Sequence, residues 1–332
     1  MRSSRELLLF VMDIDTAGEM NNGPSVNIEG KSFQEPLAKL AETMVQKVFR
    51  EGSQHLDAPS FVGEDIAIMV RHALSTYKLL FYLNADERRK NDCDWGVTYG
   101  VAAMTLVRGL IDCLYNITAI LQSPAEQGRA YRKSGIKKAL ADLEEDYQRY
   151  RGQPQWEAYV NERRGSLQNL ISASGLTIEE VMNEPMWPTF GKYISTRGPG
   201  GSLTERQEFL RTFTYMQWRQ YSALSHAAFE AYIGFIGPIP VGAYFGSDFL
   251  RHDLRPRIAA SYDTLLSVHL GRTAIVLLCM ITELQAYCHF DGASINERIC
   301  KLWETLMPLF EAKELYEGRY SQLMNTRGIT AA

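Results

Sequence analysis

The twelve prolines of this chain leave long intervals that contain no proline. Proline inside a helix removes a backbone hydrogen bond and clashes with the preceding turn, so long helices are confined to such intervals. Within them apolar residues recur every three or four positions, and no Asn-Gly hairpin joins alternating segments. This pattern predicts an all-α protein, a multi-helix bundle of six to eight helices. The expected helices lie at about 64–84, 96–122, 125–151, 155–173, 206–235, 257–290 and 294–316, with a short one at 177–183.

Irregular segments and segments rich in proline and glycine also predict where the chain divides into domains. Residues 1–58 are less regular and indicate an N-terminal extension with one helix at about 33–51. Residues 59–320 form the expected helical bundle, and 321–332 a flexible tail. Within the bundle, 185–202 are rich in proline and glycine and predict a loop, after which Thr204 or Ser202 can cap the next helix.

Composition excludes two classes of protein. The 332 residues are 45% hydrophobic, which is ordinary for a globular protein and excludes a chain that is disordered throughout. Lysine and arginine number 35 against 39 acidic residues, for a formal net charge of −4. A polybasic coat for nucleic acid is therefore excluded, although a local basic pocket is compatible with this balance.

Cysteine usage and apolar runs predict the compartment. The five cysteines are an odd number and none are spaced as C-x2-C, which favours a reducing cytoplasm and disfavours a structural metal site. The apolar run at 7–12 is shorter than the core of a signal peptide. The run at 273–282 ends at Glu283, short of a membrane span. We therefore expect a cytoplasmic protein without a membrane anchor.

Two of the expected helices carry a line of polar side chains through otherwise apolar sequence. The polar positions are spaced by three, four and four residues in the first helix and by four, three and four in the second, so each line lies on one helix face. The members are Thr105, Arg108, Asp112 and Asn116 in the helix at 96–122, and Tyr215, Arg219, Ser222 and His226 in the helix at 206–235.

These polar lines have two interpretations. Each can be the solvated side of its helix, or an ion pair such as Arg108 with Asp112 that fixes helix packing. Alternatively, the lines face each other across a cleft, where an Arg, a His, a Ser and an Asp converge on an anionic ligand. A guanidinium group binds phosphate oxygens in a fixed fork, and histidine exchanges a proton near neutral pH.

The segment from Arg219 to His226, with six residues between the two, resembles the Arg-x4–6-His motif of HEPN-type helical proteins. Many of those proteins are metal-independent endoribonucleases in toxin–antitoxin and antiviral systems. Gln220 follows the arginine here, where those ribonucleases usually carry Asn, Asp or His. The resemblance implies a helical protein that binds RNA or a nucleotide and cleaves RNA in bacterial defence.

A wider pattern resembles a second family. Arg108-x3-Asp112, followed by Arg219-x2-Ser222-x3-His226, is similar to an uncharacterised bacterial all-helical family of unknown function. Members of that family typically carry Arg-x3-Glu and then Arg-x2-Ser-x3-His. Asp112 therefore stands where a glutamate is usual, and its reach is shorter by one methylene group.

These resemblances imply RNA transesterification without a metal or another cofactor. His226 would act as general acid or base, Arg219 would stabilise the charged phosphorane, and Asp112 would orient one of them. Sites of this kind are often formed at a two-fold interface, which implies a homodimer. The substrate-binding side chains would be Arg108, Ser222, Tyr215 and Asn116.

Other candidate motifs predict less. His252-Asp253 lacks the further His and Asp residues that a metal site of the HD type needs. His72 and His269 lie among apolar neighbours and are interpreted as satisfied core histidines. A basic stretch predicts either contact with a nucleic-acid backbone or, more commonly, a solvated helix face; its members are Arg129, Arg132, Lys133, Lys137 and Lys138.

The alternative function is of a different class. If the polar lines only hold helices together, the protein is a non-catalytic helical scaffold or sensor subunit that binds a protein partner. The geometry of the two lines distinguishes these readings, because a binding site needs Arg108, Asp112, Arg219 and His226 close together at an accessible cleft.

Overall fold

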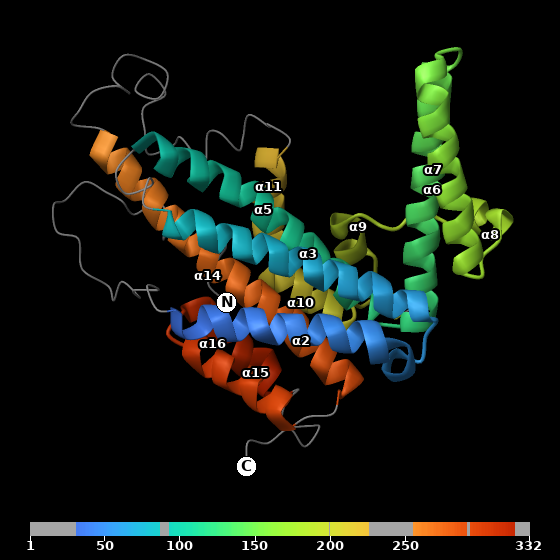
Figure 1. Ribbon diagram of the computed structural model, residues 1–332. Coiled ribbons are helices and arrows are strands. Elements are labelled where there is room, and N and C mark those ends of the chain that lie inside the picture. Colours follow the sequence, from blue (N-terminus) through green and yellow to red (C-terminus); the bar gives the residue numbers. More distant parts are fainter. Residues whose placement is uncertain (1–30, 87–92, 199, 226–254, 291–292, 323–332) are drawn as a thin grey trace.

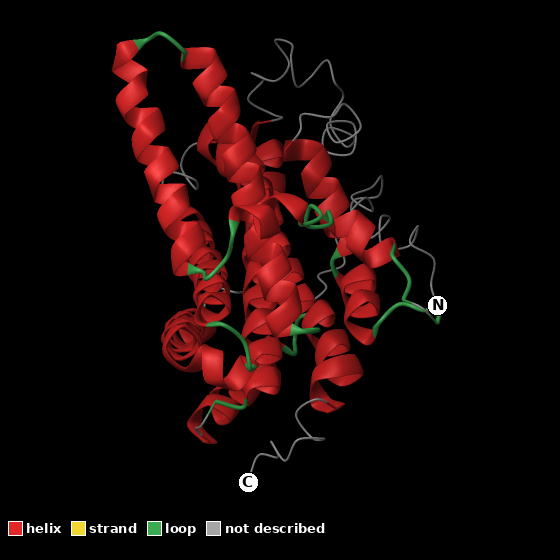
Figure 2. Cartoon of the chain, turned by 90° about the vertical axis from the view of Figure 1, so that its right-hand side faces the viewer, coloured by secondary structure: helices red, strands yellow, loops and turns green. Residues whose placement is uncertain are grey.

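The computed structural model describes residues 31–86, 93–198, 200–225, 255–290 and 293–322. The described residues are 85% helical, and Figure 2 shows only helices and connecting loops among them, so the predicted all-α class is confirmed. The predicted number of helices was too low. The described residues form twelve α-helices and one π-helical segment instead of six to eight helices.

The body of the protein is built around four long helices (Figure 1). α5 packs along α14, both contact α3, and α2 packs against α3 and α14. Their apolar faces form one core, in which Leu74, Leu110 and Leu277 are completely or almost completely buried. The four helices are α2 (Lys31–Leu56), α3 (Ser60–Ala85), α5 (Cys93–Ile120) and α14 (Arg255–Cys288).

Shorter helices cover this core. α15 packs against α2 and α14, α16 packs against α15, and a π-helical segment follows α16. α10 and α11 pack on α5, and α9 packs against α10. Their bounds are α9 (Phe190–Ser195), α10 (Glu205–Phe213), α11 (Tyr215–Ser225), α15 (Ala293–Leu306), α16 (Phe310–Leu315) and the π-helical segment Tyr316–Tyr320.

The additional helices have local causes. The helix expected at 206–235 is interrupted at the buried Thr214, whose backbone (φ −114°, ψ −19°) separates α10 from α11. Pro308 divides the helix expected at 294–316 into α15 and α16. The predicted loop at 185–202 contains the six-residue helix α9. Thr204 caps α10 as predicted, through a reciprocal capping box with Gln207.

The helix of the predicted N-terminal extension is longer than expected and belongs to the packing of the body. α2 spans Lys31–Leu56, and Leu37, Leu40 and Met44 are fully buried in the main core. The division of the chain at residue 58 stays a prediction. Residues 1–30 and 323–332, which make up most of the predicted extension and tail outside α2, lie outside the described residues.

Within the described residues, two helical segments are long and apolar enough to cross a membrane. Ala102–Ile120 is 67% buried within the protein and Val268–Cys288 is 89% buried, as is usual for core helices. The second is longer than the ten-residue run identified from the sequence because it continues through Glu283. That carboxylate is buried and accepts a hydrogen bond from Arg319 Nε at 2.7 Å. Two buried core helices of this kind are weak evidence that the chain crosses a membrane.

Three helices form an arm that projects from the body (Figure 1). They are α6 (Pro124–Tyr150), α7 (Pro154–Ala173) and α8 (Ile178–Asn183). The first turns of α6 pack against α3 and α5, and α7 and α8 pack on α6. The arm has a small core of its own, formed by Ile136, Ile171, Leu176 and Val181.

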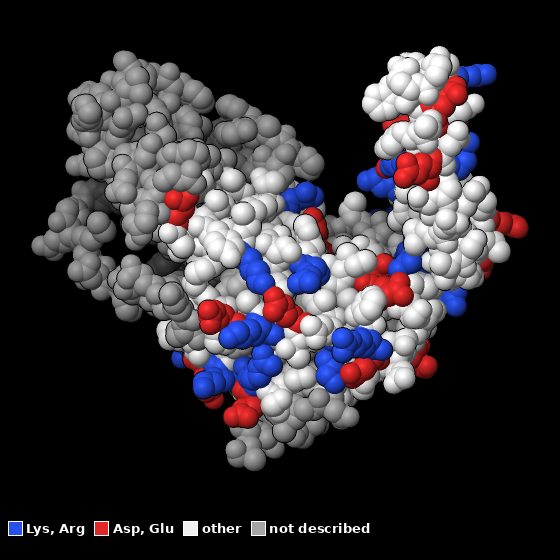
Figure 3. All heavy atoms as spheres, in the orientation of Figure 1, with Lys and Arg blue, Asp and Glu red and all other residues white. Residues whose placement is uncertain are grey.

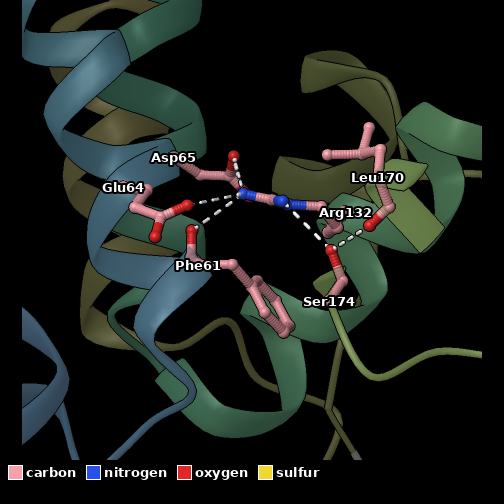
Figure 4. A network of polar contacts seen from close by, with 6 residues as sticks. All are labelled: Phe61, Glu64, Asp65, Arg132, Leu170 and Ser174. Atoms are coloured by element: carbon pink, nitrogen blue, oxygen red, sulfur yellow. Dashed lines mark hydrogen bonds and ion pairs between the residues drawn. The ribbon is translucent and has the colours of Figure 1, made fainter. Parts of the chain in front are cut away.

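Arg132 fastens the base of the arm to the body (Figure 4). Its Nε and Nη2 donate to the two carboxylate oxygens of Asp65 on α3, at 2.9 and 2.8 Å. Nη2 also donates to the carbonyl of Phe61, and Nη1 donates to the Ser174 hydroxyl just after α7, both at 3.1 Å. One guanidinium group therefore links three separate segments.

Candidate functional site

One hydrogen bond joins the two polar lines. Arg108 on α5 donates through Nε to the hydroxyl of Ser222 on α11 at 2.8 Å. The two residues are 114 positions apart in the sequence. Neither Nη nitrogen of Arg108 donates a hydrogen bond within the described residues, and the side chain is 29% exposed. Arg108 therefore keeps one edge of its guanidinium group available to a ligand.

Asp112 lies one turn after Arg108 and is held from two sides. Its Oδ1 accepts a hydrogen bond from the indole Nε1 of Trp218 at 2.7 Å, and its Oδ2 lies 3.8 Å from Arg108 Nη2. Burial raises the pKa of the Asp112 carboxyl, while the Trp218 hydrogen bond and the Arg108 charge act in the opposite direction. The Arg108 guanidinium also lies 5.7 Å from the Trp218 ring centroid.

Aromatic side chains support this cluster. Tyr215 stacks on Trp218 with ring centroids 6.2 Å apart, and Phe190 of α9 meets both rings edge-on. The predicted substrate contact Asn116 instead accepts a hydrogen bond from Trp187 Nε1 at 2.9 Å. Asn116 and Tyr215 thus both pack against aromatic neighbours in this structure, and Asn116 joins α5 to the segment before α9.

Of the predicted catalytic residues Arg219 and His226, only Arg219 lies within the described residues. Arg219 is exposed and has no hydrogen bond or ion pair with any described residue. Asp112 was expected to orient Arg219 or His226; it does not contact Arg219, and its carboxylate faces Trp218 and Arg108 instead. His226 lies outside the described residues, so its distance from this cluster is not part of the structure.

A buried polar network also involves α11, through Tyr221. The Tyr221 hydroxyl lies 3.1 Å from His269 Nδ1 and accepts a hydrogen bond from Arg272 Nη1 at 3.1 Å, while Arg272 Nη2 donates to Glu311 at 3.1 Å. Burial lowers the pKa of His269 to about 3, so its imidazole is neutral. His269 is a core histidine, as predicted, although its Nε2 has no partner among the described residues. His72 is exposed on α3, so the same prediction for it was wrong.

The basic stretch of α6 is only partly open, with Arg129 and Lys138 exposed and the other three residues engaged by the protein. Lys133 pairs with Glu184 at 3.2 Å, Lys137 donates to the Glu184 carbonyl at 2.7 Å, and Arg132 is enclosed at the base of the arm. On the face drawn in Figure 3, basic and acidic residues alternate over the described part of the body. The described residues contain no group of three potential metal ligands. The His252-Asp253 dipeptide lies outside them.

Sequence reasoning missed the two tryptophans that hold this site. Trp218 lies four residues before Ser222, a spacing that places both on one side of α11 and that could have added it to the polar line. Trp187 lies in a loop, where no periodicity indicates which way a side chain points.

The geometry offers one incompletely paired guanidinium group, a half-buried carboxylate, a hydroxyl and an exposed arginine, beside stacked aromatic rings. Such a set can bind an anion, and a histidine brought to it could move a proton. Comparison of the chain with protein-family models, with curated proteins and with solved structures finds no match.

Proposed function

We propose that this protein binds a phosphate group of RNA or of a nucleotide between α5 and α11, and that it cleaves RNA there as a HEPN-like ribonuclease. The observation that carries the proposal is the state of Arg108. One nitrogen is fixed by Ser222, which sets the orientation of the fork, and both Nη nitrogens are free of hydrogen bonds to the described chain. A preoriented fork of this kind suits two phosphate oxygens.

The surroundings of Arg108 support phosphate binding. Arg219 lies three residues before Ser222, hence on the same side of α11, and adds a second positive charge. Asp112 contributes one negative charge, so these residues carry a net charge of +1 around the proposed site. The stacked rings of Tyr215 and Trp218 lie beside it, and aromatic faces of this kind stack on bases.

The cleavage step depends on His226 and rests on the Arg219-x6-His226 pattern. A base removes the proton of the ribose 2′-hydroxyl, the 2′-oxygen attacks phosphorus, and the 5′-oxygen leaves with a proton from an acid. His226 serves as one of these two groups. Arg219 stabilises the extra negative charge on the phosphorane oxygens.

Binding and cleavage are tested separately. We expect Arg108→Gln and Arg219→Gln each to weaken binding of fluorescein-labelled single-stranded RNA about tenfold, measured by anisotropy. Arg211→Gln, an exposed arginine on α10 whose ion-pair partner is Glu208, is the matched control and leaves binding unchanged. Equal affinities for all four proteins would overturn the phosphate site.

For cleavage, RNA is incubated with the wild type and with His226→Ala. We expect wild-type cleavage that His226→Ala loses, and no cleavage of the same oligonucleotide with 2′-deoxyribose, because the attacking oxygen is missing. Equal cleavage by both proteins, or none by either, overturns the catalytic role. Sedimentation velocity tests the homodimer that the resemblance implies.

A second candidate function, a scaffold that binds a protein partner, is favoured by one observation. Ile178, Met182 and Met186 on the α8 side of the arm are 55%, 51% and 53% exposed. Exposed apolar side chains that cluster often mark protein contacts. If RNA does not bind, co-purification of a partner with the wild type, its loss with Ile178→Ser/Met182→Ser and its retention with Met216→Ser would support this function.

A further inference from the structure

A pocket of about 440 Å³ lies at the C-terminal ends of α5 and α14. It is formed where the residues after α5, the start of α10, the last turns of α14 and the π-helical segment meet. Its volume falls within the range of small-molecule sites. The polar side chains that line it are Gln122, Thr204, Glu205, Arg206, Glu283 and Arg319.

Arg319 is held by two carboxylates of the protein itself. Its Nε donates to Glu283 Oε1 at 2.7 Å and its Nη1 donates to Glu205 Oε1 at 2.6 Å. The guanidinium lies 4.6 Å from the ring centroid of Phe209, and only 10% of the side chain is exposed. Glu283 is 2% exposed, so Arg319 neutralises a carboxylate that would otherwise be costly to bury.

Arg206 is left without a comparable partner. Its nearest carboxylate oxygen, Glu283 Oε2, lies 3.9 Å from Nε, which is beyond hydrogen-bond distance. Nε is buried and has no hydrogen-bond partner among the described residues. Tyr287 supports the guanidinium from one side, at 5.8 Å from its ring centroid, and 24% of the side chain is exposed.

The formal charges of the pocket lining cancel, but they are unevenly paired. Arg319 contacts both Glu283 and Glu205, whereas Arg206 lies 3.9 Å from its nearest carboxylate oxygen. The N-terminus of α10, capped by Thr204, adds a partial positive charge at the same place. A second arginine is not needed to neutralise Glu283.

We infer that this pocket binds a small organic anion, and that the guanidinium of Arg206 holds its phosphate or carboxylate group. A phosphate and a carboxylate each offer two oxygens to the planar guanidinium group. The ligand is therefore defined by its charged oxygen pair, which both groups share. Binding also gives the buried Nε of Arg206 the acceptor that it lacks.

This site is distinct from the one between α5 and α11. Gln122 follows Arg108 by fourteen residues, or about 21 Å along a helix. None of the residues lining the pocket contributes to the Arg108 cluster. Loss of RNA binding through Arg108→Gln therefore leaves this inference unaffected.

The test uses the full chain and calorimetric titration with three probes: ribose 5-phosphate, succinate and uncharged ribose. We expect ribose 5-phosphate, succinate or both to bind, and ribose not to bind. Arg206→Gln weakens the binding about tenfold to a hundredfold, as expected for hydrogen bonds to a charged group. Arg211→Gln, five residues later on the same helix, is the matched control and does not change it. Which of the two charged probes binds shows whether the pocket takes a phosphate or a carboxylate.

A second measurement needs no variant. Phenylglyoxal modifies accessible arginines, and mass spectrometry locates the modified positions. A binding probe should slow the modification of Arg206 and leave that of Arg211 unchanged. Binding that Arg206→Gln does not weaken, equal protection of both arginines, or no binding of either charged probe would overturn the inference.

Discussion

The Arg132 cluster at the base of the arm and the Arg108 cluster between α5 and α11 are made of the same parts. Each joins an arginine of a long helix to a carboxylate and to a serine hydroxyl of another segment. They differ in completeness: Arg132 uses Nε, Nη1 and Nη2 and is 10% exposed, whereas Arg108 uses Nε alone for hydrogen bonds and is 29% exposed.

This difference separates a structural arginine from one available to a ligand. A buried guanidinium group has lost its water, so each donor needs a protein acceptor, and Asp65, Phe61 and Ser174 supply them for Arg132. Arg108 remains partly hydrated at its Nη groups. A bound anion can replace that water without breaking a contact of the fold.

The largest expected effect comes from the same substitution in both clusters. Arg132→Ala leaves Asp65 buried without its partner, which costs about 3–5 kcal/mol of unfolding free energy. Arg108→Ala removes one hydrogen bond and a long ion pair from a partly exposed site, for about 1 kcal/mol. Urea unfolding followed by circular dichroism measures both values.

Arg132→Lys is the control for this prediction. It keeps the charge and loses the fork, so its unfolding free energy should lie between those of the wild type and Arg132→Ala. Equal losses of unfolding free energy for Arg132→Ala and Arg108→Ala would show that the number of hydrogen bonds made by each guanidinium group does not distinguish a structural arginine from a ligand-binding one.

A smaller effect tests the close approach that makes the Arg132 cluster possible. Gly128 lies one turn before Arg132 on α6, and a Cβ there would lie 2.6 Å from both γ-carbons of the buried Val62 on α3. Gly128→Ala should cost about 1–3 kcal/mol of stability because the two helices must separate. Thermal and urea unfolding measure the change.

Gly135 provides the matched control on the same helix. A Cβ there meets nothing within 4 Å, so Gly135→Ala should raise stability by about 0.5–1 kcal/mol through helix propensity. A stabilising Gly128→Ala would mean that α3 and α6 do not need this contact.

The long helices could be predicted from the sequence because proline placement and apolar spacing are local signals. α9 could not, because it lies within a segment rich in proline and glycine that indicates a loop, and the break between α15 and α16 at Pro308 was not predicted. The role of Arg132 was equally hidden. Its partner Asp65 is 67 residues away, and the basic stretch around it looks like a solvated face until α3 and α6 are packed together.

The candidate site was predicted in part. Regular spacing placed Arg108 and Ser222 on two helix faces, and their hydrogen bond brings those faces together. The partner of Asp112 was not predictable in the same way, because Arg108 on its own helix and both Trp218 and Arg219 on α11 are candidates for one carboxylate. Which of them reaches it depends on how α11 is rotated against α5.

The smallest expected effect on stability concerns Asp112 and depends on pH. Burial raises the pKa of this carboxyl in the folded protein, so the folded state holds its proton more tightly than the unfolded state. The contribution of Asp112 to stability is therefore fully present below the unfolded pKa, near 3.9, and is lost as pH rises through the folded pKa. Asp112→Asn lacks this titration, and its side-chain oxygen can still accept from Trp218.

We therefore expect the unfolding free energy of the wild type, relative to Asp112→Asn, to fall as pH rises from about 3.9 and to level off once the folded carboxyl is ionised. The same substitution removes the negative charge 3.8 Å from Arg108, so RNA should bind more tightly at neutral pH even though Asp112 is expected to serve cleavage. Urea unfolding across this pH range and RNA anisotropy are the two measurements. A relative stability that rises with pH would mean that the ion pair with Arg108 outweighs the burial of Asp112, and would contradict this prediction.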